Sequence, residues 1–350
     1  MTINELKQLQ LYRQHLTNKS DKLTVVRDLC GVQSQYLSNA YHSLFIRCAD
    51  RFDLKDNWSD GLTKNWTVRG TVHVFDKADL PLFKYDDGMY LSNEWNDAIC
   101  NGDLWISAER KKLFADFIVE RVNSRGSITR EELRDECRAF GMTKWDESYI
   151  FDGWGGLLRP LCERGFISYR AQEKKAFEAV PRYEPMRRET ALKEQFTRYL
   201  NHMAPASMRD IAYFFGFSQA KVKEVLGCLD VKTLTISGSE YFCMGMIPDD
   251  LPDIPGCLFL AGFDQLMLGY QKQDSIYISR EHIRGIFSLA GIVFPCVLLD
   301  GNAVGRWKKK NKKIVVSSFD ELRVSQKKII EDAAEELWRG EIKSIEFDLI

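Results

Sequence analysis

Gln33 and Gln35 are the residues whose type and spacing most directly suggest chemistry. They flank Ser34, shortly after Gly31, a residue that predicts the end of the preceding helix. On extended or turn backbone, residues two apart face the same way, so the two side-chain amides would converge on one point. Each amide offers an acceptor and two donors, so the pair can hold and aim one water molecule. In a regular helix they would point about 200° apart, and two glutamines on a polar turn by chance are the alternative interpretation.

The rest of the sequence lacks the common enzyme signatures. It contains no G-x-S-x-G, no Walker A motif and no H-E-x-x-H motif. Its nine cysteines include no C-x-x-C pair, a pattern typical of reduced thiols in a cytosolic protein. No metal-ligand spacing joins the five histidines, His15, His42, His73, His202 and His282. We therefore expect no zinc site, no other metal and no cofactor.

The composition is that of an ordinary globular protein. The 350 residues are 45% hydrophobic and 28% charged, which suits two to four compact modules. The longest apolar stretches, such as Ile292–Leu299, have the length of a strand, and the N-terminus carries no signal-like apolar run. The expected location is therefore the cytoplasm, with no membrane partner. A net charge of −1 weakly opposes nucleic-acid binding, but a DNA-binding protein needs only one basic face.

The elements that must position the glutamines follow a pattern that occurs three times: short amphipathic helices across a tight turn, then a hairpin. The clearest copy has one helix over Glu189–Leu200, a second from Ser207 to a break at Gly216, and a third capped by Ser218. Two predicted strands around Ser237–Ser239 complete it. This order is typical of a winged helix, in which the last helix enters a DNA groove and the hairpin is the wing.

The other two copies are less regular. In the first, helices over Thr2–His15 and Lys22–Cys30 precede the glutamines, and Trp66–Phe75 is a predicted strand. In the second, the predicted third helix is Trp154–Glu163, followed by a charged wing. Beyond a Pro-rich boundary at 247–256, Asp300 and Gly301 lie between apolar runs and predict a two-residue hairpin.

The predicted fold class is α+β, with tandem winged-helix units and a C-terminal β-rich α+β domain that is barrel-like. The predicted parts are a first winged helix carrying the glutamines at 1–105, a second at 106–182, a third at 183–248 and the C-terminal domain at 249–350. Three winged helices in tandem favour a DNA or RNA binder. Winged helices also serve as dimerisation and scaffold modules, which is the alternative.

The run LCGVQSQYLSNAYHSLFIRC resembles the winged-helix family that includes the AlkZ-type DNA glycosylases, whose members carry a G-V-Q-x-Q segment. A sister group has aspartate at the position of Gln35. Further stretches resemble the same family, occur in the family order and span nearly the whole chain; they are WTVRGTVHVF, HMAPASMRDIAYFFGF, FLAGFDQLMLGY and GIVFPCVLLDGNAVGRWKKK. The pairs Phe263-Asp264 and Gly269-Tyr270 belong to these stretches, and their apolar surroundings predict a role in the fold.

The resemblance implies a glycosylase that excises N7-alkylated purines from double-stranded DNA and unhooks crosslinks joined through such bases. An N7-alkylguanine is cationic and already a good leaving group, so the enzyme must mainly hold a water near C1′ and stabilise the sugar. Gln33 and Gln35 would hold that water. The sequence offers no evident lysine nucleophile for lyase chemistry, so the expected product is an abasic site, formed by a monomer without metal or cofactor.

Two groups of residues are predicted to contact DNA. Arg69, Thr71 and His73 would alternate on one face of the predicted strand, where they could line the lesion cleft or form a cross-strand polar ladder. The segment Arg306–Lys313 carries six cations in eight residues. Its alternative interpretation is a solvated hairpin or a lysine-protected edge strand. The residues expected to meet the DNA backbone are Arg306, Lys308, Lys309 and Lys310.

Two other functions remain open at this point. One is a non-catalytic winged-helix DNA binder, such as a transcriptional regulator, although neither an evident dimerisation helix nor an effector domain supports it. The other is a scaffold protein without a nucleic-acid role, for which the near-zero net charge is the main support.

Overall fold

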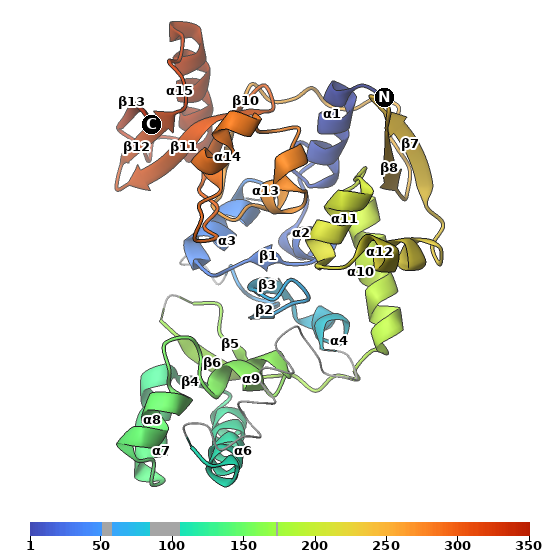
Figure 1. The fold of residues 1–350 in the computed structure, drawn as a ribbon. Coiled ribbons are helices and arrows are strands. Elements are labelled where there is room, and N and C mark those ends of the chain that lie inside the picture. The colour runs from blue at the N-terminus through green and yellow to red at the C-terminus, as the bar shows by residue number, and fades with distance from the viewer. Residues whose placement is uncertain (51–57, 85–105, 173) are drawn as a thin grey trace. The chain divides into compact units, whose positions relative to one another are not determined.

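The computed structural model describes residues 1–50, 58–84, 106–172 and 174–350 (Figure 1). The chain forms two compact units: a larger unit of Met1–Leu54 with Phe196–Ile350, and a smaller unit of Lys55–Gln195. The larger unit thus combines the start of the predicted first part with most of the third part and all of the fourth. Cys100 and the predicted boundary at residue 105 lie outside the described residues. Both units mix helices and strands, which confirms the α+β class.

Three helices and one short extended segment form the N-terminal part of the larger unit. The Thr2 hydroxyl accepts a hydrogen bond from the Glu5 N–H at 3.2 Å and begins the first helix, and the Asp21 carboxylate caps the second. The predicted helices are confirmed, although the second ends at Asp28, earlier than expected. These elements are α1 (Ile3–Arg13), α2 (Lys22–Asp28), β1 (Val32–Gln33) and α3 (Leu37–Phe45).

The predicted order of three helices and a hairpin is present in 188–243. Ser207 begins the second helix by accepting from the Asp210 N–H, and Ser218 begins the third by accepting from the Lys221 N–H. Gly216 ends the second helix in the left-handed region, as predicted. The elements are α10 (Arg188–His202), α11 (Met208–Phe215), α12 (Gln219–Leu226) and the antiparallel strands β7 (Lys232–Ile236) and β8 (Ser239–Cys243).

A five-stranded sheet with a helix on one face closes the larger unit. Its strand order is β13-β12-β11-β10-β9, with β13 parallel to β12 and the other pairs antiparallel. The predicted hairpin is confirmed, because Leu299 pairs with Asn302 across Asp300-Gly301. The order is that of an open sheet with edges at β13 and β9, so the barrel-like closure expected from the sequence is wrong. The strands are β9 (Cys257–Leu260), β10 (Cys296–Leu299), β11 (Asn302–Lys310), β12 (Lys313–Ser318) and β13 (Ser344–Leu349).

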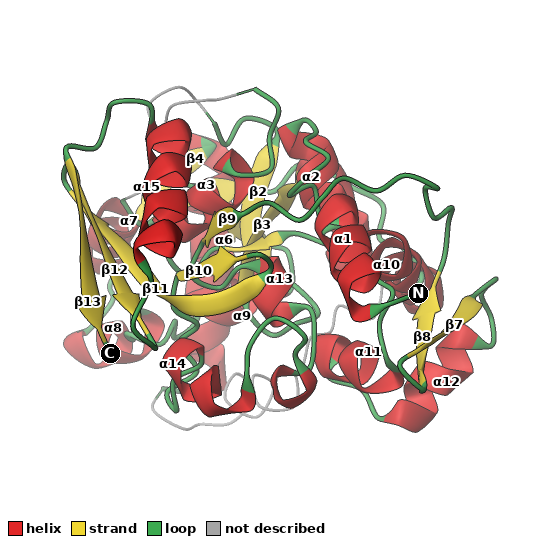
Figure 2. Ribbon diagram, turned by 90° about the horizontal axis from the view of Figure 1, so that it is seen from above, coloured by secondary structure: helices red, strands yellow, loops and turns green. Residues whose placement is uncertain are grey.

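The long C-terminal helix lies against this sheet (Figure 2). Its contacts with the sheet include aromatic rings. The ring of Trp338 lies 5.1 Å from that of Phe259 and 5.3 Å from that of Trp307, between centroids. Short helices connect β9 with β10. The helices of this region are α13 (Gln265–Leu268), η2 (Lys272–Asp274), η3 (Arg280–His282), α14 (Ile283–Ile286) and α15 (Val324–Trp338).

The smaller unit packs helices α6, α7 and α8 against a sheet in which β3, β2, β5, β6 and β4 follow one another (Figure 1). Two predictions are wrong here. The strand Trp66–Phe75 is a hairpin, because the Gly70 N–H donates to the Thr67 carbonyl and closes a turn. The helix Trp154–Glu163 starts only at Leu158, because Gly155 has a φ of 120°, which a helix does not allow.

The smaller unit contains five described strands and six described helices. Its strands are β2 (Leu62–Trp66), β3 (Val72–Asp76), β4 (Ser127–Thr129), β5 (Ile167–Tyr169) and β6 (Ala176–Ala179). Its helices are η1 (Lys77–Asp79), α4 (Leu80–Phe83), α6 (Ala108–Arg125), α7 (Arg130–Ala139), α8 (Lys144–Ile150) and α9 (Leu158–Glu163). Among the described helices of both units, none has the length and apolar content needed to cross a membrane.

Candidate functional site

The two glutamines lie on extended backbone between α2 and α3. Cys30 and Gly31 both have positive φ, 54° and 87°, and turn the chain sharply after α2. The backbone is then extended at Gln33, and α3 begins only at Leu37. The Gln33 Nε2 donates to the Gln35 Oε1 at 3.1 Å, so the two amides meet, as the spacing predicted. Gln33 is buried, at 5% exposed, whereas Gln35 is exposed.

The segment from the end of β9 to the start of α13 packs against the stretch that carries the glutamines. The Gln265 side-chain amide donates to the Gly31 carbonyl, at the turn that aims the glutamines. The ring of Tyr36 stacks on Phe263 with centroids 6.0 Å apart. Gly262 approaches Asn39 so closely that a Cβ there would lie 2.7 Å from the Asn39 Nδ2. The backbone on both sides of the glutamine pair is therefore fixed by buried neighbours.

A buried ion pair anchors α3 to the same segment. The Arg47 Nη2 lies 2.7 Å from the Asp264 Oδ1, and both side chains are 0% exposed. The Ser43 hydroxyl donates to the same carboxylate at 3.1 Å. Burial alone would raise the pKa of Asp264, but the Arg47 guanidinium holds that pKa below its ordinary value. The predicted role of Phe263-Asp264 in the fold is confirmed, because both residues are buried and Asp264 closes this network.

The geometry of the glutamine pair suits one task, the positioning of a small polar molecule. The contact between the amides fixes the Gln35 side chain through its buried partner. Each amide oxygen has two lone pairs, so the pair retains acceptor capacity for a water proton at an exposed position. Neither amide titrates, so the pair can aim a water molecule but is a poor base.

The three residues predicted on one strand face are separated by the turn between β2 and β3. Arg69 and Thr71 lie in the turn and are half-buried, whereas His73 lies in β3 and is 0% exposed. The His73 Nδ1 lies 3.0 Å from both the Thr71 carbonyl and the Thr67 hydroxyl. Burial, with the nearby Arg69, lowers the pKa of His73 to about 3. His73 is thus a neutral core residue. Arg69 and Thr71 reach the surface in part, but the Thr71 hydroxyl is buried.

The four predicted cations of β11 have different surroundings. Arg306 lies over the Phe294 ring at 3.9 Å and donates to the Gly285 carbonyl, so its guanidinium is held against the fold. Lys309 pairs with Glu341 at 2.7 Å on the face that carries α15. Lys308 and Lys310 are exposed and share the opposite strand face. The basic segment therefore lies in the part of the β11–β12 hairpin next to its turn. Of its four residues predicted to contact DNA, two point outward.

One lysine of the smaller unit has an unusual environment. Burial lowers the pKa of Lys84 to about 7, a value that could suit a nucleophile. Its Nζ, however, donates to the carbonyls of Trp66 and Glu163 at 3.1 Å each, and the residue is 2% exposed. Lys84 therefore links β2 to the end of α9 within the fold.

The fold also brings together a cluster that the sequence did not predict. His15, Asp28 and His202 place one ligand atom each within 4.8 Å of one another. They come from the ends of three helices, so no local spacing could reveal them. The histidines lack ligand spacing along the chain, and only the fold brings two of them together with Asp28.

Comparisons with known proteins show the family to which the chain belongs. The chain matches the family model described as DNA glycosylase AlkZ-like over residues 26–339. It is 26% identical over 337 residues to a Streptomyces sahachiroi protein named interstrand DNA cross-link repair glycosylase, covering 89% of this chain and 88% of that protein. It shares the fold of the solved Streptomyces sahachiroi DNA glycosylase AlkZ, with a TM-score of 0.78, 22% identity and 100% of both chains covered. Because the family model spans most of the chain, the protein belongs to the AlkZ-like family of DNA glycosylases.

Proposed function

We propose that this chain is a monofunctional DNA glycosylase that hydrolyses the N-glycosidic bond of cationic N7-alkylated purines, with Gln33 and Gln35 positioning the attacking water. The observation that carries the proposal is the 3.1 Å contact between the two amides, one buried and one exposed, on extended backbone. Family membership supports the reaction class. The name of the Streptomyces relative, interstrand DNA cross-link repair glycosylase, supports crosslinked purines as further substrates.

The chemistry of this lesion suits two neutral amides. Alkylation at N7 places a positive charge on the purine, so the base departs as a neutral molecule with the electrons of the C1′–N9 bond. The enzyme must place a water oxygen at C1′ while positive charge develops on the sugar. The water forms the new bond to C1′ and its proton passes to solvent, which leaves an abasic site. A carboxylate at position 35 would be the stronger base, so the neutral pair restricts activity to activated lesions.

The exposure of Gln35 suits a bulky or crosslinked lesion. A glycosylase with a closed pocket must extrude its target base, and a purine tied to the opposite strand cannot follow that path. A glutamine pair on a surface segment can meet C1′ without enclosing the base. We therefore include unhooking of interstrand crosslinks in the proposed function.

The DNA contacts belong to the same proposal. We propose that α10, α11, α12 and the β7–β8 hairpin form one winged helix, and that α6, α7 and α9 with β5 and β6 form another. Arg69 in the β2–β3 turn and Lys308 and Lys310 on β11 would contact phosphates, with Thr71, Arg306 and Lys309 beside them. His73 would support the turn from the core. The protein would act as a monomer on double-stranded DNA in the cytoplasm.

The experiment that tests the proposal incubates the protein with three duplexes: one with 7-methylguanine, one crosslinked through guanine N7, and one unmodified. The expected result is free 7-methylguanine, separated strands and an uncleaved abasic site, with no base released from unmodified DNA. Retained DNA binding without release from either damaged duplex would overturn it in favour of the non-catalytic winged-helix binder.

A further inference from the structure

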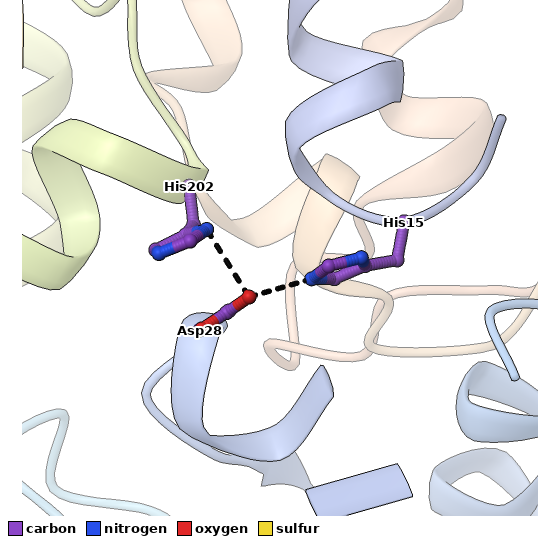
Figure 3. Close-up of side chains that lie close together, drawn as sticks. All are labelled: His15, Asp28 and His202. Atoms are coloured by element: carbon purple, nitrogen blue, oxygen red, sulfur yellow. Dashed lines mark hydrogen bonds and ion pairs between the residues drawn. The ribbon is translucent and has the colours of Figure 1, made fainter. Parts of the chain in front are cut away.

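Three helix ends meet at a cluster of ligand-type side chains in the larger unit, away from the glutamine pair's own contacts. His15 follows α1, Asp28 is the last residue of α2, and His202 is the last residue of α10. The His15 Nε2 lies 2.7 Å from the Asp28 Oδ2, and the His202 Nδ1 lies 3.2 Å from the same oxygen. Figure 3 shows both rings directed at this carboxylate.

The hydrogen bonds around His15 leave it with a lone pair facing the carboxylate. The Asn18 carbonyl lies 3.0 Å from the His15 Nδ1, and because a carbonyl only accepts, Nδ1 carries the proton. In the neutral ring, Nε2 then faces the Asp28 oxygen, and a carboxylate also only accepts. Two lone pairs at 2.7 Å repel each other, and a cation bound by both atoms would remove that repulsion.

The donor set is one that a borderline metal ion prefers. Two imidazoles and one carboxylate form a common three-ligand set of Zn²⁺. The bond from the His15 Nδ1 to a backbone carbonyl is the usual way in which a protein orients a metal-binding imidazole.

A pocket beside the cluster leaves room for a further ligand. Its volume is about 300 Å³, and both histidines line it. Water can therefore complete a tetrahedral shell. The positive charges of Arg13 and Arg198 act on His202 and disfavour a cation, although the Arg13 guanidinium already donates to four backbone carbonyls, those of residues 200, 204, 244 and 246.

We propose that His15, Asp28 and His202 bind one Zn²⁺ ion, which ties together the ends of α1, α2 and α10. Zinc–ligand bonds of about 2.0–2.1 Å place tetrahedral donors about 3.3 Å apart, so binding would widen the His15–Asp28 contact by roughly 0.6 Å. The two nearby arginines make the expected affinity micromolar. Asp28 stands just before the turn at Gly31, so the bound ion would also stiffen the approach to the glutamines.

The test is a titration of the full chain with zinc chloride after treatment with a chelator, without DNA, followed by calorimetry. We expect one ion per chain and a higher Tm with zinc. His202→Ala, which removes a half-buried ligand, should weaken binding by about tenfold or more. His282→Ala is the matched control, because His282 also faces two carboxylates, Asp320 at 3.2 Å and Glu281 at 3.8 Å, at the protein surface.

Two outcomes would overturn the site. One is an absence of zinc binding in the micromolar range. The other is binding that His202→Ala does not weaken more than His282→Ala. A circular dichroism spectrum and Tm of each zinc-free variant show that it is folded before titration. Because no DNA is present, the result is independent of the proposed glycosylase activity.

Discussion

The Gln33–Gln35 segment and the turn between β2 and β3 present the same spacing of polar side chains on different backbones. At Gln33 the chain stays extended, and the two amides meet at 3.1 Å. Between Arg69 and His73 the chain turns, so Arg69 stays at the surface while His73 enters the core. Side chains two residues apart therefore lie together only where the backbone between them does not turn.

Each region also holds a buried polar atom without a hydrogen-bond partner among the described residues. Behind the glutamines, the Gln265 Nε2 donates to the Gly31 carbonyl, but the Gln265 Oε1 is such an atom. In the other region, the His73 Nε2 is buried with no hydrogen-bond partner among the described residues. The bonds behind the glutamines hold the exposed Gln35 amide in place. The burial of His73 lowers the stability of the fold in conditions where its ring would become charged.

The largest expected effect comes from removing the support of the glutamine pair. Asp264→Ala leaves the Arg47 guanidinium buried without its carboxylate, which should lower the free energy of unfolding by about 3–5 kcal/mol. Asp274→Ala is the control, because Asp274 pairs with Arg209 at the surface at 3.3 Å and should cost less than about 1 kcal/mol. Denaturant unfolding of both variants measures the difference, and equal losses would contradict the anchoring role of Asp264.

The next largest effect is the contribution of His73 to the pH dependence of the free energy of unfolding. The unfolded pKa of histidine is about 6.5 and that of folded His73 is about 3, so below pH 6.5 the unfolded chain gains a proton that the folded chain does not. Stability therefore falls with acidification from pH 6.5 toward pH 3. Between pH 7 and pH 5, the free energy of unfolding of His73→Gln should fall by about 2 kcal/mol less than that of the wild type. Unfolding curves at the two pH values test this, and parallel losses would show that His73 does not titrate as a buried neutral ring.

A smaller effect tests the turn that aims the glutamines. Gly31 has a φ of 87°, and an alanine there should cost about 1–2 kcal/mol of stability. The matched change is Gly227→Ala, at a residue of the same unit with a φ of −64°, which should be nearly neutral. Thermal unfolding compares the two, and similar Tm values would show that the sharp turn after α2 is not required.

The smallest effect distinguishes the outward lysines of β11 from the paired one. Each phosphate contact adds about 0.9 to the slope of log affinity against log salt, so Lys308→Ala with Lys310→Ala should reduce that slope by about 1.8. Lys309→Ala should reduce it less, because Lys309 is paired with Glu341. Binding titrations at several salt concentrations give the slopes. A larger effect for Lys309→Ala would reverse our assignment of the two strand faces.

Local signals predicted much of this molecule, because their physics is local. Helix starts at Thr2, Ser207 and Ser218 depend on a side chain and an N–H three residues away, and the Asp300-Gly301 hairpin depends on its own turn. The contact between Gln33 and Gln35 belongs to the same class. The sequence did not reveal α8, and it placed Arg69, Thr71 and His73 on one strand because the turn at Gly70 was not recognised.

Distant polar contacts could not be predicted. Buried Lys7 on α1 donates to the Gly301 carbonyl at 2.9 Å, and the Gln10 amide donates to the Pro205 carbonyl at 2.7 Å. The buried residues of α1 include Lys7, Gln10 and Arg13 as well as three leucines, so the helix has no clear amphipathic pattern and its packing could not be predicted from the sequence. The cluster of His15, Asp28 and His202 is hidden for the same reason, since only the fold brings the three helix ends together.

Single-turnover release of 7-methylguanine by Gln35→Ala shows whether the glutamine pair positions the attacking water. Gln35 is exposed, so its loss should leave the fold and the affinity for the same duplex unchanged. We predict a rate at least about 100-fold below that of the wild type, and an unchanged rate for Ser38→Ala, an exposed neighbour on α3. Wild-type release by Gln35→Ala at unchanged affinity would contradict the account.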